Sequence, residues 1–78
     1  MTDTVPPQTS SEVAHKVGTN VRRVLGTQGR DLTWLADQIG VTVDGILRAF
    51  TERVPFGLIF DMAEAMQVRP DTLIEGAA

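Results

Sequence analysis

The sequence lacks cysteine and tyrosine, and it contains a single histidine among its 78 residues. Without cysteine the chain can form no disulfide, no thiolate zinc site and no cysteine nucleophile, which argues against a disulfide-stabilised secreted domain. The lone histidine, His15, has no second histidine with which to share a metal ion, so we expect a surface position and no metal site. No apolar run approaches the roughly 20 residues of a membrane-spanning helix. These absences favour the reducing cytoplasm, away from any membrane.

Signatures of catalysis are missing as well. The sequence has no glycine-rich phosphate loop and no histidine placed near a serine and a carboxylate. A chain of this size also offers little room for a deep substrate pocket. We therefore expect no enzymatic activity, no catalytic residue, no cofactor and no small-molecule substrate.

The composition is that of one small globular domain. Hydrophobic residues make up 42% and charged residues 22% of the chain, which is enough apolar material for a core and too little charge for full disorder. The N-terminal segment MTDTVPPQTS lacks the basic start and apolar centre of a signal peptide. We expect residues 1–9 to form a flexible tail and residues 10–78 to form the domain.

Five segments carry apolar residues at the spacing of one helix face, and none shows the alternation typical of a strand. The expected helices span residues 10–25, 32–39, 43–51, 55–66 and 70–75. We expect Thr9 and Glu12 to form a capping box on the first helix and Gly26 to end it in a left-handed conformation. Pro55 and Pro70 suit the first turns of the fourth and fifth helices. The sequence therefore predicts an all-α protein.

The segment from Leu32 to Thr51 has the pattern of two helices that cross through a tight turn. Ala36 is small where the helices must approach, Gly40 can adopt the positive φ of a sharp turn, and Ile46 can fill the wedge between them. The N-caps that we expect for these helices are Asp31 and Thr42. The pattern predicts a helix-turn-helix, whose second helix enters the major groove in DNA-binding proteins of this architecture.

Residues in two separate segments carry a resemblance to a known family. They are Leu35-Ala36, Ile39-Gly40-Val41-Thr42, Ile46, Pro55, the run from Met62 to Val68, and Leu73-Ile74. With these residues the chain resembles the Cro and phage-repressor (Xre-type) helix-turn-helix family over roughly Val17 to Glu75. The resemblance implies a compact five-helix bundle with a central helix-turn-helix, a lambda-repressor-like DNA-binding domain.

The resemblance also implies a partner and a set of site residues. The partner is double-stranded DNA, bound by a repressor that occludes a promoter in the cytoplasm of a bacterial cell or a phage-infected host. The base-reading positions fall on Val43, Asp44 and Arg48, of which Arg48 can chelate guanine O6 and N7. The positions expected to hold the DNA backbone are Arg30, Thr33, Thr42 and Arg53. A homodimer is expected to form through a seam in the last helix that includes Leu73 and Ile74.

The net charge of the chain argues against simple DNA binding. The net charge is −3, whereas affinity for DNA usually comes with a basic surface. The C-terminal third is acidic and most of the cations precede it, so a basic face remains compatible with the total. Arg22 and Arg23 are adjacent on the first helix, point in different directions, and at most one of them can face DNA.

Two departures from the family pattern keep a second interpretation open. Leu32 stands where family members commonly carry a glutamine that links phosphate to the recognition helix, and Glu52 adds a negative charge in the loop after that helix. The alternative is a protein-protein interaction module with the helix-turn-helix fold and without DNA binding, in which Arg48 is a surface residue paired with Glu52. Its docking residues on the exposed helix would be Val43, Leu47 and Phe50.

Overall fold

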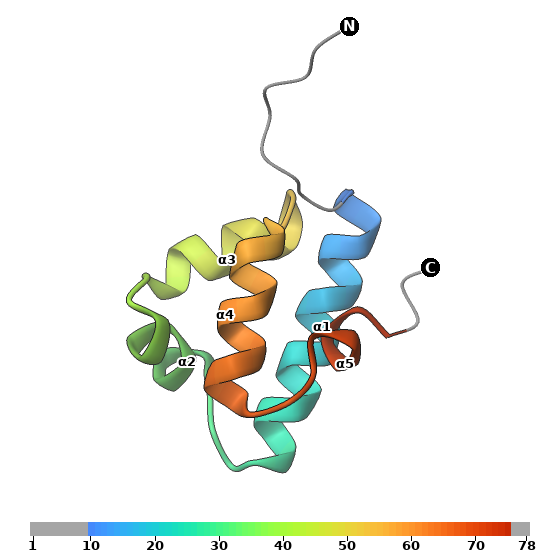
Figure 1. Cartoon of the computed structure of the whole chain (residues 1–78). Coiled ribbons are helices and arrows are strands. Elements are labelled where there is room, and N and C mark those ends of the chain that lie inside the picture. Colours follow the sequence, from blue (N-terminus) through green and yellow to red (C-terminus); the bar gives the residue numbers. More distant parts are fainter. Residues whose placement is uncertain (1–9, 76–78) are drawn as a thin grey trace, which may run out of the picture.

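The computed structural model describes residues 10–75, and these form five α-helices and no β-strand (Figure 1). The helices are α1 (Ser11–Thr27), α2 (Leu32–Ile39), α3 (Val43–Thr51), α4 (Phe56–Met66) and α5 (Pro70–Ile74). The prediction of an all-α protein is confirmed. The expected N-terminal tail and Thr9 lie outside the described residues.

Both ends of α1 differ from the sequence prediction. The N-cap is Ser10, whose hydroxyl accepts a hydrogen bond from the backbone N–H of Val13 at 3.3 Å. Gly26 lies inside the helix, and the left-handed conformation falls on Gly29, with φ of 68°. The helix is longer than predicted because glycine does not have to end a helix when the next residues continue its hydrogen bonds. The backbone N–H of Gln28 caps the helix by donating to three of its carbonyl oxygens.

The turn between α2 and α3 follows the prediction closely. The Asp31 carboxylate accepts a hydrogen bond from the N–H of Trp34 at 2.9 Å, and the Thr42 hydroxyl accepts one from the N–H of Gly45 at 3.0 Å. Gly40 ends α2 with φ of 77°, a conformation that costs glycine nothing. Both helix starts and the intervening turn are therefore fixed by local interactions.

Helix α1 lies against α3 and α5, and α2 lies against α4. The core is made of the apolar side chains that all five helices and the α3–α4 loop turn inward: Ala14, Val17, Val21, Val24, Leu25, Leu35, Ala36, Ile46, Phe50, Val54, Ile59, Met62, Ala63, Met66 and Leu73. Gly18 of α1 allows a close approach to α3, because a Cβ atom there would lie 2.9 Å from Cγ of Phe50. This glycine sets how deeply α3 sits against α1.

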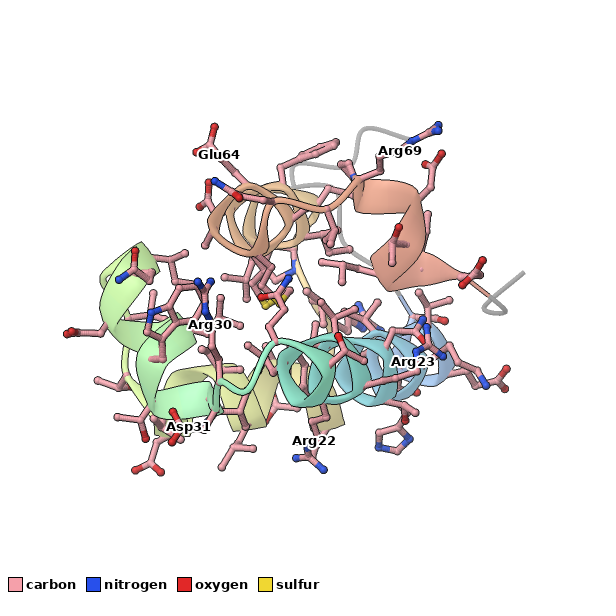
Figure 2. The ribbon with its side chains drawn as sticks, turned by 90° about the horizontal axis from the view of Figure 1, so that it is seen from below. Arg22, Arg23, Arg30, Asp31, Glu64 and Arg69 are labelled. Atoms are coloured by element: carbon pink, nitrogen blue, oxygen red, sulfur yellow. The ribbon has the colours of Figure 1, made fainter. Side chains whose placement is uncertain are left out.

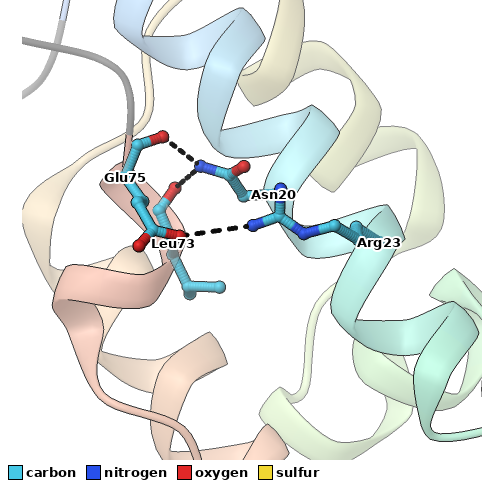
Figure 3. A network of polar contacts seen from close by, with 4 residues as sticks. All are labelled: Asn20, Arg23, Leu73 and Glu75. Carbon is cyan, nitrogen blue, oxygen red and sulfur yellow. Dashed lines mark hydrogen bonds and ion pairs between the residues drawn. The ribbon is translucent and has the colours of Figure 1, made fainter.

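A buried asparagine joins α1 to α5 and the residue that follows it (Figure 3). The Asn20 side chain is 2% exposed, and its Nδ2 donates hydrogen bonds to the backbone oxygens of Leu73 and Glu75, both at 2.9 Å. Leu73 itself is 0% exposed. The expectation that Leu73 contributes an exposed surface to a dimer seam is therefore wrong, since the asparagine anchor draws α5 into the core.

Candidate nucleic-acid interface

Helix α3 has a buried inner side and an exposed outer side. Ile46 and Phe50, four residues apart, are buried in the core, whereas Asp44 and Arg48, also four residues apart, are exposed. Residues at this spacing lie above one another on a helix, so the two pairs define opposite sides. The outer side of α3 is available to a partner.

Arg48 is the cationic residue on this exposed outer side. The ion pairs among residues 10–75 do not include it, and its guanidinium has no hydrogen-bond partner there. The expected alternative, an ion pair with Glu52, is therefore not formed; instead the Arg48 carbonyl accepts from the Thr51 hydroxyl at 2.9 Å and from the Glu52 N–H at 3.0 Å. The planar fork of five donors remains free for a ligand.

The other two predicted base-reading residues have different settings. Asp44 is exposed in the first turn of α3, where its carboxylate is stabilised by the positive end of the helix dipole. Val43 is half-buried and packs against the core, so only part of its side chain is accessible. All three predicted residues thus lie on one helix, and Arg48 is the exposed cation among them.

The predicted backbone-contacting residues lie in the loops and first turns around α2 and α3. Thr33 is exposed in the first turn of α2, and Arg53 is exposed in the loop after α3. Thr42 uses its hydroxyl oxygen as a cap acceptor, which leaves the hydroxyl proton free to donate. Arg30 stacks over the Trp34 ring, with its guanidinium carbon 4.0 Å from the ring centroid. The cation-π contact fixes the position of this arginine and leaves the donors at its edges accessible.

The structure also distinguishes the two adjacent arginines of α1, which sequence reasoning left undecided. Arg23 pairs with Glu75 at 3.7 Å. Arg22 points to a different side of the helix (Figure 2) and lines a hollow together with Arg30 and Thr33. Arg22 therefore lies beside the predicted backbone-contacting residues, and the sequence held no signal to separate it from its neighbour.

Exposed apolar residues lie mainly outside α3. Phe50, expected as a docking residue of the alternative module, is 3% exposed and belongs to the core. Phe60 of α4 is 57% exposed, Phe56 at the start of the same helix is also exposed, and Ile74 lies at the border of exposure. Phe56 and Phe60 of α4 are therefore part of the exposed apolar surface of the described residues, together with Val41 in the turn before α3 and Ile74 of α5.

Neither a cluster of metal ligands nor a membrane-spanning helix is present among the residues that the structure describes. No three histidine or acidic side chains among residues 10–75 gather closely enough to hold a metal ion. In the same part of the chain, no helix has the length and apolar character needed to cross a membrane.

Comparison with known proteins gives no relative for this chain. It matches no protein-family model, no curated protein and no solved structure. Any function must therefore be argued from the residues and their geometry.

Proposed function

We propose that the protein is a sequence-specific DNA-binding transcriptional regulator in which α2 and α3 act as a helix-turn-helix. Helix α3 enters the major groove of an operator and its outer side reads base edges. The observation that carries the proposal is Arg48, exposed on that side with no ion-pair partner in the described chain. A bidentate arginine–guanine contact is the commonest specific contact in DNA recognition. Val43 and Asp44 lie beside it at the start of the helix.

Residues around the two helices hold the DNA backbone in this proposal. Thr33 and Thr42 donate from the starts of α2 and α3, and Arg30 and Arg53 supply charge from the adjoining loops. The net charge of −3 means that few phosphates are neutralised, so a single domain binds weakly and with a shallow salt dependence. A homodimer on a twofold operator compensates, because half-sites about 34 Å apart let two weak domains act together.

The regulator acts as a repressor of Cro type, by occluding a promoter, and it needs neither a cofactor nor a catalytic step. Of the expected dimer seam, Ile74 stays accessible after Leu73 is assigned to the core. A twofold contact would therefore be formed by Ile74 of α5 and the other exposed apolar residues, and Leu73 would take no part in it.

The proposal is tested by fluorescence anisotropy at low salt, first with random-sequence duplex DNA and then with a duplex selected from a random pool. Arg48→Ala removes the base contact, while Arg69→Ala removes an equal charge at the N-cap of α5, outside α2 and α3 (Figure 2). One bidentate pair contributes about 1–3 kcal/mol of base discrimination, so Arg48→Ala should weaken binding to the selected duplex about fivefold to 150-fold. Arg69→Ala should bind as the wild type does. If Arg48→Ala binds the selected duplex as tightly as the wild type does, α3 is not the recognition helix.

A protein-interaction module with the same fold is the second candidate. It is favoured by the exposed Phe56 and Phe60 of α4, and by the carboxylates of Asp44 and Glu52 near the proposed DNA surface. The anisotropy experiment separates the two functions. A folded wild-type protein that binds no duplex at low salt would support the interaction module.

A further inference from the structure

We infer that Arg22 of α1 binds a phosphate of the DNA backbone, so that the interface extends from the helix-turn-helix onto a third helix. The inference rests on the proposed function and goes beyond it, because it assigns a phosphate-binding role to one of two adjacent arginines. Its basis is the position of Arg22 relative to α2 and α3.

Arg22 lies where two surface hollows meet. The first, between α1 and α2, is lined by Arg22 together with Arg30 and Thr33. The second, between α1 and α3, is lined by Arg22 together with Leu47 and Thr51. One exposed side chain thus borders the first turn of α2 and the second half of α3. A duplex that lies along α3, with a phosphate beside the start of α2, passes over this arginine.

The two adjacent arginines have different partners. Arg23 turns toward α5, where its guanidinium lies 3.7 Å from the Glu75 carboxylate. Arg22 has no ion pair or hydrogen bond to its side chain among residues 10–75. Figure 2 shows the two side chains pointing to different sides of α1, with Arg22 and Asp31 on the same side. A guanidinium without a partner beside the proposed DNA surface is suited to a phosphate.

One carboxylate, that of Asp31, lines the same hollow as Arg22. One of its oxygens accepts the cap hydrogen bond from the Trp34 N–H at 2.9 Å. Asp31 does not pair with Arg22 at salt-bridge distance, and Arg30 contributes a second positive charge to the same hollow. Two arginines and one carboxylate therefore line this hollow, a balance of charge that favours an anion.

The test compares Arg22→Gln with Arg23→Gln, two variants that remove one charge each from adjacent positions of one helix. Anisotropy titrations with the selected operator and with an unrelated duplex are repeated over a series of salt concentrations. A phosphate contact carries no sequence information, so Arg22→Gln should weaken both complexes by a similar factor of several-fold. It should also reduce the slope of log K against log salt by about 0.9. Arg23→Gln should leave affinity and slope at the wild-type values, and Arg22→Lys, which retains the charge, should restore the slope.

The outcomes are distinct from those that test the proposed function. In one outcome the wild type binds DNA, Arg48→Ala weakens binding, and Arg22→Gln keeps the wild-type affinity and salt slope or loses no more than Arg23→Gln does. The inference about Arg22 is then overturned and the DNA-binding function stands. If the wild type binds no duplex, both fall together. Circular dichroism of each variant identifies any loss of binding that arises from unfolding.

Discussion

Replacing Gly18 by alanine inserts a methyl group where α1 and α3 touch, and we expect it to destabilise the protein. The new Cβ would lie 2.9 Å from Cγ of Phe50 and 3.1 Å from two further carbons of the same side chain. Carbon atoms pack favourably at about 3.5–4.0 Å, so Phe50 must retreat by about half an ångström or more. Phe50 is 3% exposed and surrounded by core residues, so this movement strains its neighbours. Overpacking of this kind costs about 1–3 kcal/mol.

Gly26→Ala is the matched control, because it makes the same change in the same helix at a site with no atom within 4 Å of the new Cβ. Alanine improves helix propensity by up to about 1 kcal/mol in either variant. The difference between the two variants is therefore the steric term, about 1–3 kcal/mol in the free energy of unfolding. For a domain of this size it corresponds to at least about 4 °C between their melting temperatures.

Urea denaturation and thermal melting, both followed by circular dichroism, measure the two effects. Gly26→Ala should be slightly more stable than the wild type, and Gly18→Ala should be less stable than Gly26→Ala by the steric term. Equal stability of the two alanine variants would refute the reasoning, since it would mean that α3 can move away from α1 without cost.

Two further substitutions test other contacts, each by the same denaturation experiments. Asn20→Ala leaves two backbone oxygens near α5 without their donor and should lower the free energy of unfolding by about 1–3 kcal/mol, whereas Thr19→Ala on the exposed side should change it by less than about 0.5 kcal/mol. Equal losses for these two variants would contradict a role for the buried amide. Gln67→Gly should stabilise by up to about 1 kcal/mol, because Gln67 is the one non-glycine residue in the described chain with a positive φ, at 58°. A loss of stability would show that the glutamine side chain contributes more than the backbone strain that it imposes.

The features predicted correctly from the sequence depend on interactions within a few residues. Asp31 and Thr42 cap α2 and α3 as expected, and Gly40 adopts the left-handed turn between them. Each of these features depends on a side chain or a φ angle acting three residues away or less. The spacing of the apolar residues indicates the five helices and the side of each helix that is buried. It therefore also predicts most of the core.

The features that the sequence did not predict depend on contacts between distant segments. Asn20 reaches carbonyls more than 50 residues away, and nothing in its local sequence marks it as buried. Arg22 and Arg23 are the same residue type at neighbouring positions, and only the location of Glu75 separates them. Phe60 continues the apolar run of α4 but is exposed, because its position on the helix lies off the side formed by the buried Ile59, Met62, Ala63 and Met66.

The stacking of Arg30 on Trp34 provides an optical reporter at the edge of the proposed site. The chain contains one tryptophan, so its entire indole emission originates at the first turn of α2. A guanidinium resting 4.0 Å above the indole is a direct part of the environment that determines this emission. Any ligand that draws Arg30 off the ring changes the fluorescence of the unlabelled protein, and the signal needs no assignment because one indole emits.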